Sequence, residues 1–404
     1  MQNITMNPDL AHLHPYPFEK LAALKAAVNA PAQLNDIMLS IGEPKHEPPA
    51  FVLQTLVDNL AKLSNYPTTK GLPELRNAIA TWACTRFKLK AQDFTADKHV
   101  LPVNGTREAL FAFAQAIVDR SKKNPLVVSP NPFYQIYEGA AILSGAEPYF
   151  LNCTPANNFI PDFAAVPAEV WQRTQLLFVC SPGNPTGAVM SSAQLQALIQ
   201  LADQYDFVIA SDECYSELYF DEANPPVGLL QACADMGRND FARCVVFHSL
   251  SKRSNLPGLR SGFVGGDAKI LEKFLLYRTY HGCAMPVPTQ LASTAAWQDE
   301  THVIENRRAY TEKFDAVIEI LGDVLPVTKP DASFYLWVKT PIAGEDFAQQ
   351  LFAQQKVTVL PGSYLARSSK GLNPGEDYVR MALVAPLHEC VEAAQRIKAF
   401  VQSL

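Results

Sequence analysis

The chain has 404 residues, of which 48% are hydrophobic and 18% are charged. This composition is typical of globular proteins and differs from that of disordered or fibrous ones. The 34 basic and 40 acidic residues give a net charge of −6 without any basic run, which argues against nucleic acid as a partner. The sequence contains no apolar run of ~20 residues and no signal-like N-terminus, so we expect a cytoplasmic protein with no membrane partner.

Eight cysteines and eight histidines are scattered along the sequence. No CxxC pair occurs, and no histidine lies at a metal-ligand spacing from a cysteine. We therefore expect reduced, mostly buried thiols and no metal site.

The length of the chain favours two domains, because a single hydrophobic core stops growing below this size. We predict an N-terminal arm with part of a small domain at 1–48, a large domain at 49–288 and a small C-terminal domain at 289–404. A chain of this size can bury a sizeable cleft between its domains.

Short β-rich runs alternate with helix-like stretches between about residues 100 and 265. The predicted strands lie at 126–129, 176–180, 207–211, 244–249 and 262–266, and the predicted helices at 105–120 and 191–205. This alternation predicts βαβ units and a mostly parallel sheet that is buried on both faces.

The C-terminal part has a different pattern. Long helical stretches at 289–321, 344–355 and 386–402 flank short predicted strands at 334–338, 357–360 and 378–383. These features favour a separate α+β domain.

Polar side chains follow three successive predicted strands of the first region. Asn184 comes after one strand, Asp212 and Tyr215 after the next, and the third is followed by Ser249, Ser251, Lys252 and Arg260. Because ligands bind beyond the carboxyl ends of parallel strands, we expect these side chains to share one site. Each of them alone is more typical of a turn, a helix cap or a solvated charge, so the prediction depends on their combination and order.

Three motifs in this order, SPGNPTG at 181–187, SDECY at 211–215 and SLSKRSNLPGLRSG at 249–262, resemble those of the class I and II aminotransferases. The resemblance extends over essentially the full chain. It implies an α/β fold of fold-type I, with a mostly parallel seven-stranded sheet in a large domain and a smaller α+β domain. It also implies pyridoxal 5'-phosphate as the cofactor and an amino acid and a 2-oxo acid as substrates.

The resemblance gives each catalytic residue a role that its chemistry explains. Lys252 would bind the cofactor aldehyde and later move the substrate proton, which requires an amine with a lowered pKa. Asp212 would keep the ring nitrogen protonated, so that the ring can withdraw electrons. Asn184 and Tyr215 would donate hydrogen bonds to the phenolate oxygen of the ring.

The phosphate of the cofactor needs backbone donors at a helix N-terminus and at least one cation. The motif VNGTREAL at 103–110 offers Gly105 and Thr106 at the start of a predicted helix. By resemblance, the other cofactor contacts are Ser249, Ser251, Arg260, the stacking ring of Tyr134, and Tyr66 reaching over from a neighbouring subunit. The last contact implies a homodimer. For Gly105-Thr106 an ordinary helix cap, and for Tyr134 a core aromatic, are the alternatives.

The substrate carboxylate has two predicted contacts by resemblance, in addition to Asn184. Arg380 in YVRMAL matches the arginine that binds the α-carboxylate, for which a bidentate guanidinium is suited. Gly42 in SIGEP matches the glycine whose backbone approaches the same group. We add Lys70 as a hypothetical second cation for a remote negative charge on the substrate; a solvated surface lysine is the alternative.

Three further stretches, at 16–24, 277–297 and 357–367, are similar to those of aminotransferases that act on N-succinyldiaminopimelate in lysine biosynthesis. We therefore expect transfer between N-succinyl-LL-2,6-diaminopimelate and 2-oxoglutarate. Aspartate, aromatic amino acids or kynurenine are alternative substrates. One departure from the family pattern is that Ala332-Ser333 replaces a glycine pair before the predicted strand at 334–338.

Other functional classes also fit parts of the sequence. Ser249-Leu250-Ser251-Lys252 reads as S-x-x-K, the nucleophile motif of some serine acyl-transfer enzymes, but the S-D-N and K-T-G motifs of that class are missing. A lyase or decarboxylase on the same scaffold is a further alternative, because the fold does not fix the reaction. A ligand-sensing module of a transcription regulator would need an additional DNA-binding domain.

Overall fold

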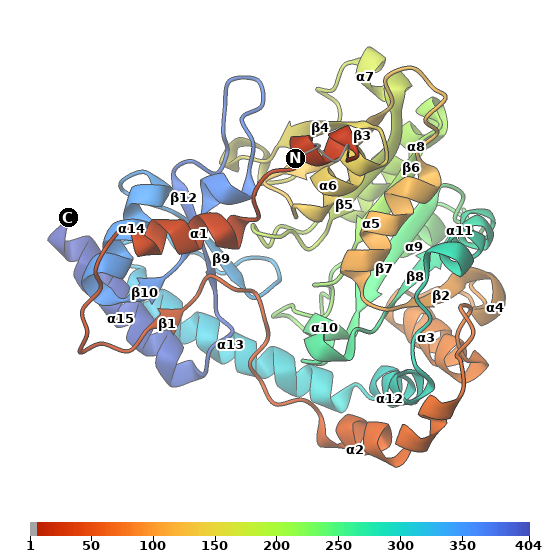
Figure 1. Ribbon diagram of the computed structural model, residues 1–404, viewed down its shortest axis with the longest axis horizontal. Helices are drawn as coiled ribbons and strands as arrows, with labels where there is room; N and C mark the ends of the chain where they lie inside the picture. Colours follow the sequence, from red (N-terminus) through yellow and green to blue (C-terminus); the bar gives the residue numbers. More distant parts are fainter. Residues whose placement is uncertain (1–5) are drawn as a thin grey trace, which may run out of the picture.

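The computed structural model describes residues 6–404. Its larger part is built around a seven-stranded sheet in the order β2-β8-β7-β6-β5-β3-β4 (Figure 1). The strands are β2 Val100–Val103, β3 Leu126–Asn131, β4 Glu147–Asn152, β5 Thr174–Cys180, β6 Val208–Asp212, β7 Cys244–Ser249 and β8 Gly262–Gly266. Neighbouring strands from β4 to β7 are parallel, and β8 is antiparallel to both β7 and β2. The prediction of a mostly parallel seven-stranded sheet is confirmed.

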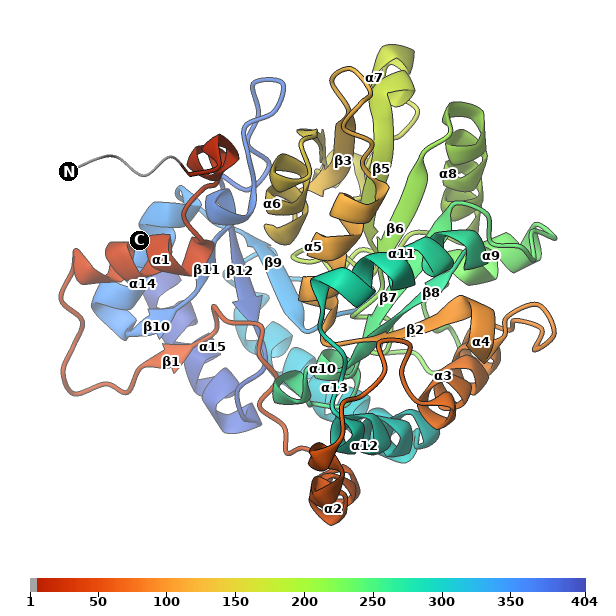
Figure 2. The ribbon, with the colours of Figure 1, turned by 45° about the vertical axis from the view of Figure 1, so that its right-hand side comes forward.

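Each face of this sheet is covered by helices, as the apolar strands require. In β5, Leu177 and Val179 enter one hydrophobic core, whereas Leu176 and Phe178 enter the core on the opposite face. Side chains of a strand alternate between faces, so a continuous apolar run marks a strand buried on both sides. The sequence therefore dictates a layer of helices on each face (Figure 2).

The two helical layers of the larger part come from different segments. One core is covered by α5 Thr106–Ile117, α6 Ile136–Leu143 and α11 Ala268–His281. The other is covered by α3 Pro73–Arg86, α7 Ala168–Arg173, α8 Ser192–Tyr205, α9 Leu229–Asp235 and α12 Val287–Gln298. The remaining helices here are α2 Ala50–Asp58, α4 Ala96–His99 and α10 Leu250–Arg253.

The smaller part contains an antiparallel sheet, β11-β12-β9, and a parallel pair, β1 with β10. The strands are β1 Ile37–Met38, β9 Tyr335–Lys339, β10 Val357–Thr358, β11 Leu360–Pro361 and β12 Tyr378–Ala382. The helices are α1 Pro17–Ala26, α13 Thr301–Leu321, α14 Gly344–Gln355 and α15 Leu387–Ser403. This part has its own hydrophobic core, as expected for the C-terminal pattern, while the boundaries at 48 and 288 stay a prediction.

The single long helix predicted at 289–321 is wrong, because two helices occupy this range. The chain leaves helical geometry at Asp299, whose side chain accepts a hydrogen bond from the backbone N of His302 at 3.1 Å and so caps the start of α13. The first helix, α12, packs Ala292, Ala296 and Trp297 into a core of the large sheet. The second helix, α13, continues into the smaller part. Likewise the strand predicted at 357–360 is divided into β10 and β11.

The segment that follows β1 runs between the smaller sheet and α10 before it reaches α2 (Figures 1 and 2). We call residues 40–46 the bridging segment. Its position places backbone carbonyls from the start of the chain beside the ends of β7 and β12. Within residues 6–404, no helix combines the length and the apolar character that crossing a membrane requires.

Candidate active site

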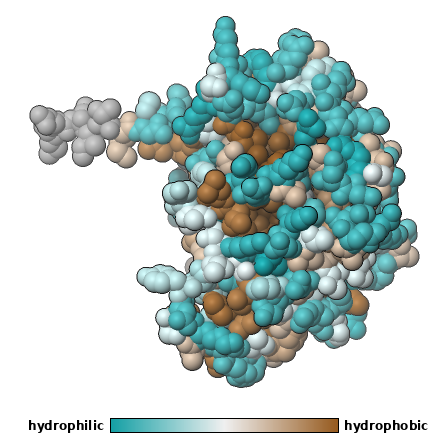
Figure 3. All heavy atoms as spheres, turned by 90° about the vertical axis from the view of Figure 1, so that its right-hand side faces the viewer, coloured by the Kyte–Doolittle hydropathy of each residue, from teal (hydrophilic) through white to brown (hydrophobic). Residues whose placement is uncertain are grey.

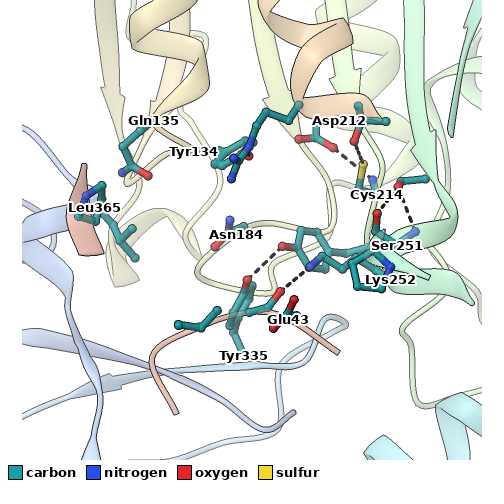
Figure 4. A pocket seen from close by; sticks show the side chains of 18 of the residues that line it. Glu43, Tyr134, Gln135, Asn184, Asp212, Cys214, Ser251, Lys252, Tyr335 and Leu365 are labelled. Atoms are coloured by element: carbon teal, nitrogen blue, oxygen red, sulfur yellow. Dashed lines mark hydrogen bonds between the residues drawn. The ribbon is translucent and has the colours of Figure 1, made fainter. Parts of the chain in front are cut away.

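A cavity of about 420 Å³ lies at the carboxyl ends of β5, β6 and β7. In Figure 4, Asn184, Asp212 and Lys252 from the sheet side face Glu43 and Tyr335 across this space. The lining contains these residues named from the sequence: Gly42, Thr106, Tyr134, Asn184, Asp212, Tyr215, Ser249, Ser251, Lys252, Arg260 and Arg380. The predicted convergence of strand-end side chains is therefore present in the fold.

The Lys252 amine lies in α10, the short helix after β7, and points into the cavity. Its Nζ donates a hydrogen bond to the carbonyl oxygen of Gly42 and lies 5.2 Å from the centre of the Phe334 ring. Burial, with a further contribution from the positive charge of Arg380, lowers the pKa of Lys252 to about 8. The lowered pKa increases the fraction of this amine that is neutral, and hence nucleophilic, near neutral pH.

The Asp212 carboxylate ends β6 and is almost fully buried beside the cavity. It accepts hydrogen bonds from the Tyr137 hydroxyl at 2.8 Å and from the backbone N of Cys214 at 3.3 Å. Both partners are neutral, and burial raises the pKa of Asp212. A cation in the cavity would compensate this buried carboxylate, which is otherwise costly to leave unpaired.

The N-terminus of α5 borders the same cavity. Gly105 precedes this helix with φ 92°, a conformation that favours glycine, and a Cβ there would overlap the Arg260 guanidinium. The first N–H groups of a helix have no partner inside it and suit an anion. Arg260 contacts the Glu108 carboxylate at 2.6 Å, and the Ser249 and Ser251 hydroxyls lie 2.9 Å apart. Backbone N–H groups, hydroxyls and a guanidinium are the donors that an anion such as a phosphate requires.

The wall opposite the sheet is built by residues far apart in the sequence. The Arg380 side chain is 4% exposed and lies between the Asn184 side chain at 3.0 Å and the Ser40 carbonyl at 2.8 Å. No carboxylate contacts this guanidinium within the described part of the chain, and its buried Nε has no hydrogen-bond partner. The Tyr335 hydroxyl lies 3.1 Å from that of Tyr215. A carboxylate ligand would pair the free charge of Arg380.

The cavity is also lined by a third arginine, Arg107, which the sequence motifs did not single out. Arg107 donates hydrogen bonds to the Tyr134 hydroxyl at 2.7 Å and the Tyr16 hydroxyl at 3.3 Å. Burial raises the pKa of Tyr134, so this phenol stays neutral and does not neutralise the arginine. In the sequence, Arg107 could have been recognised as a site residue from its position directly after Gly105-Thr106. Tyr16 and Tyr335 carried no such signal.

Two predicted residues lie away from the cavity of their own chain, and Gly105 adjoins the cavity without being part of its lining. Tyr66 is fully exposed, and Lys70 lines a different hollow, where it contacts Asp97 at 2.5 Å. Tyr66 was predicted to act across a subunit interface, and Lys70 as a second cation for the substrate. For these two residues the sequence-based roles stay predictions.

Comparison with known proteins identifies the family. The sequence profile described as "Aminotransferase class I and II" matches residues 35–397. This chain belongs to the class I and II aminotransferases. The aminotransferase is 30% identical over 397 residues to the LL-diaminopimelate aminotransferase of Desulforudis audaxviator (strain MP104C), with 96% of each chain covered.

Solved structures are also similar to this aminotransferase over nearly its whole length. An aminotransferase from Neisseria meningitidis Z2491 is 52% identical, with a TM-score of 0.94 and coverage of 98% of this chain and 99% of that chain. A protein described as a "probable N-succinyldiaminopimelate aminotransferase" from Thermus thermophilus is 25% identical, with a TM-score of 0.83 and coverage of 95% and 100%. Both likenesses support the fold-type I architecture.

The donor set of the cavity fits pyridoxal 5'-phosphate, the cofactor of class I and II aminotransferases. Asp212 would offer its carboxylate, which has no cationic partner, to a cationic ring nitrogen, and Lys252 would offer an amine to the aldehyde. The α5 N-terminus with Ser249, Ser251 and Arg260 would offer N–H and O–H donors and a cation to the phosphate. When bound, this cofactor withdraws electrons and so eases removal of the proton from the substrate Cα.

The geometry also weakens the interpretation as a serine acyl-transfer enzyme. The Ser249 hydroxyl is hydrogen-bonded to the Ser251 hydroxyl and to the Ser261 carbonyl. Within residues 6–404, the Lys252 amine contacts the Gly42 carbonyl rather than a serine hydroxyl. A lysine in that position does not act as the base for Ser249.

Proposed function

We propose that this aminotransferase transfers the amino group of N-succinyl-LL-2,6-diaminopimelate to 2-oxoglutarate, which gives N-succinyl-2-amino-6-oxopimelate and glutamate. The observation that carries the proposal is that Arg380 and Arg107 both reach the cavity without a carboxylate partner among the described residues. A substrate with carboxylates at both ends would pair both charges. A relative named for N-succinyldiaminopimelate supports this choice, and relatives named for LL-diaminopimelate support the wider class of diaminopimelate substrates.

Arg380 is the proposed site of the α-carboxylate. Asn184 and Ser40 hold two of its nitrogens, and its guanidinium stacks over the Tyr335 ring at 4.3 Å. These contacts fix the plane of the guanidinium before a substrate arrives, so little conformational entropy is lost on binding. Gly42 lies next to this pocket, where a Cβ would overlap the Tyr335 hydroxyl.

Arg107 is the proposed site of the remote carboxylate. It lines the cavity, where the Tyr134 and Tyr16 hydroxyls orient its guanidinium. Lys70 was predicted for this task from the sequence, and it would have to act in the neighbouring subunit. Arg107 requires no second subunit, and both remain candidates until they are compared directly.

The proposed proton carrier is Lys252, whose lowered pKa suits an amine that takes and returns a proton near neutral pH. Asp212 is proposed to hold the ring nitrogen in its protonated form, and Asn184 and Tyr215 to bind the ring oxygen. Tyr335 and Gly42 line the cavity opposite these groups.

We further propose that the functional unit is a homodimer in which Tyr66 reaches the neighbouring phosphate site. Tyr66 is fully exposed, and the preceding segment exposes these large apolar side chains: Phe51, Leu53, Val57, Leu60 and Leu63. Apolar patches are also visible among polar side chains in the view of Figure 3. Burial of such patches stabilises association. Sedimentation of the wild type should give a dimer; a monomer with full activity would contradict the proposal.

The substrate is tested by measuring kcat/KM with 2-oxoglutarate as acceptor and a panel of amino donors. The panel contains N-succinyl-LL-2,6-diaminopimelate, LL-2,6-diaminopimelate, aspartate, phenylalanine and kynurenine. We expect the succinylated compound to have the highest kcat/KM. A higher value for unsuccinylated LL-2,6-diaminopimelate, or for any other donor, would overturn the substrate proposal but not the membership of the family.

The two candidate cations are compared by parallel substitution to glutamine. Arg107→Gln should lower kcat/KM for the succinylated donor by about 10–100-fold, because a charge-assisted pair contributes ~1.5–3 kcal/mol. Its effect on alanine, which has no remote carboxylate, should be small. If Lys70→Gln gives the larger effect and Arg107→Gln almost none, Lys70 binds the remote carboxylate.

A further inference from the structure

The bridging segment contacts both proposed substrate-handling side chains through its backbone. The Ser40 carbonyl accepts a hydrogen bond from Arg380 at 2.8 Å, and the Gly42 carbonyl accepts one from Lys252. Carbonyls can orient two cations only if the segment itself is held in place. The far end of the segment, at His46, must therefore be fixed by other groups.

His46 is hydrogen-bonded through both ring nitrogens. Its Nδ1 lies 2.6 Å from the Oδ1 of Asn306, and its Nε2 lies 2.6 Å from the Nζ of Lys313. Asn306 in turn uses its Nδ2 to contact the backbone carbonyls of Lys252 at 3.3 Å and Arg253 at 3.4 Å. A continuous chain of polar contacts thus leads from Lys313 to the backbone of Lys252.

The hydrogen-bond acceptors in this series of polar contacts allow one arrangement of protons. Asn306 donates to two carbonyls, so its Oδ1 is the acceptor, and it also accepts from the Asn255 amide at 3.0 Å. His46 must then donate from Nδ1, which leaves Nε2 as the acceptor for Lys313. The histidine is therefore neutral, with its proton on Nδ1.

Lys313, at the end of this series of polar contacts, is unusual because its amine is buried. It lies on α13, is 2% exposed, and also donates to the Val384 carbonyl at 3.2 Å. Burial lowers its pKa to about 8, and among the described residues the one charge interaction that shifts this pKa comes from Cys390 rather than from a carboxylate. Burying an amine without a counter-ion is costly. The cost of burying Lys313 therefore favours a functional role for the contact between His46 and Lys313, in addition to packing.

We propose that His46, Asn306 and Lys313 form a positioning relay, which holds the bridging segment and the Lys252 backbone in the arrangement that transamination needs. The relay spans three separate segments: the bridging segment, α13 and α10. It acts through Lys252 and Gly42 and does not touch the substrate. The proposal rests on the role proposed above for Lys252, but it does not depend on which amino acid is the substrate.

The contact between His46 and Lys313 should be lost at low pH. Burial and the charge of Lys313 lower the pKa of His46. A second proton on His46 would place an N–H against the Lys313 ammonium, so the contact is intact above the lowered pKa of His46 and lost as the pH falls through it. The other titratable groups around the pair are Tyr310 of α13, whose ring centre lies 4.5 Å from that of His46, and Cys390 of α15 near Lys313. Glu43 and Lys45 of the bridging segment pair with each other at 3.1 Å.

The first test measures the pKa of His46 by NMR of histidine side chains, with the resonance assigned from its loss in His46→Asn. In Lys313→Met the neighbouring positive charge is gone, so the pKa of His46 should rise. Lys339→Met, at the exposed end of β9, is the control and should leave it unchanged. A His46 pKa that does not move in Lys313→Met would overturn the coupling of the pair. This readout needs neither substrate nor turnover.

The second test uses His46→Asn, which keeps an N–H for Asn306 but cannot take up a proton. We expect kcat to fall about tenfold, the effect of losing one buried hydrogen bond, with KM for the amino donor changed by less than about twofold. The acid-side loss of kcat in the wild type should be absent in both Lys313→Met and His46→Asn, because neither variant has the contact that protonation of His46 breaks. His388→Asn, at an exposed site of α15, should behave as the wild type.

A double-substitution cycle separates the relay from two independent structural effects. If the pair acts as a unit, His46→Asn with Lys313→Met should lose no more kcat than the larger of the two single losses. Additive losses, or wild-type kcat and pH profile in His46→Asn, would overturn the proposal. The role of Lys252 is checked separately by borohydride trapping of the cofactor, so a failure there is distinguishable from a failure of the relay.

Discussion

The two walls of the cavity are assembled from different kinds of chain segment. The sheet wall takes Asn184 from the turn after β5, Asp212 from the end of β6 and Lys252 from α10, which follows β7; these three strands are hydrogen-bonded neighbours. The opposite wall takes Gly42, Tyr335 and Arg380 from the bridging segment and the smaller sheet. The first wall is positioned by one continuous sheet, whereas the second depends on packing between distant parts. We therefore expect substitutions in the sheet wall to affect the reaction itself and those in the opposite wall to affect binding, pKa values or stability.

The largest expected effect is that of Lys252→Ala. Loss of the amine removes both the covalent anchor of the cofactor and the proposed proton carrier, so kcat should fall by roughly 10⁴-fold or more. Borohydride treatment should no longer fix the cofactor to the protein. Lys123→Ala, an exposed lysine, serves as the control. Label found on another lysine of the wild type would contradict the assignment.

A smaller effect is expected for Asp212→Asn, which keeps the volume but removes the negative charge. The ring nitrogen would lose its counter-ion, and kcat should fall by about 10²–10³-fold, as is typical for loss of one electrostatic contact to the reacting centre. Steady-state kinetics and borohydride trapping on the same sample give the two readouts, and trapping should persist. Asp235→Asn, at the exposed end of α9, is the control. Near-normal turnover in Asp212→Asn would mean that another group keeps the ring protonated.

The pH dependence of cofactor attachment should depend on residues of both walls. Only the neutral amine of Lys252 reacts with the aldehyde, and its pKa is lowered to about 8 by burial and, in smaller part, by the charge of Arg380. In cofactor-free protein, the attachment rate should therefore rise with pH up to about 8 and then level off. Arg380→Met removes a positive neighbour, so the midpoint should move to higher pH. A midpoint that stays in place would show that Arg380 does not influence Lys252.

The smallest effect concerns Ser333, which stands where the family usually has glycine. Its φ is +86°, a left-handed conformation that costs an L-residue ~1–2 kcal/mol, and its backbone N donates to the Leu218 carbonyl at 2.6 Å. Ser333→Gly should raise the free energy of unfolding by about 1 kcal/mol, measured by urea denaturation. Ser254→Gly is the contrast: φ at Ser254 is −124°, so glycine should destabilise there. If both substitutions change the free energy of unfolding in the same direction, the proposed strain at Ser333 is contradicted.

The sheet wall could be predicted from the sequence because each of its signals is local. An apolar run followed by Asn184, Asp212 or Lys252 shows both the strand and the residue at its end. Two strands of the same sheet, β2 and β4, escaped prediction. The first is four residues long and contains Pro102, and the second begins with exposed Glu147 and is largely half-buried, so neither has the continuous apolar run of a central strand.

The opposite wall could be predicted only where a motif of the family marked it, as at Gly42 and Arg380. Tyr335 lies within an aromatic strand whose sequence does not tell which ring faces the cavity, and the direction of Arg107 depends on Tyr16 and Tyr134. The contact of His46 with Lys313 joins distant segments and leaves no local pattern. Such pairings follow from tertiary packing rather than from propensity or periodicity.

The pairing of β1 with β10 has a consequence for the order in which the protein matures. Ile37 leaves the ribosome long before Val357, yet they are partners in one parallel pair. During synthesis, the large sheet can therefore form while the bridging segment still lacks its support. A nascent chain would present Lys252 in an open groove, and the enclosed site would be completed only as the final strands emerge.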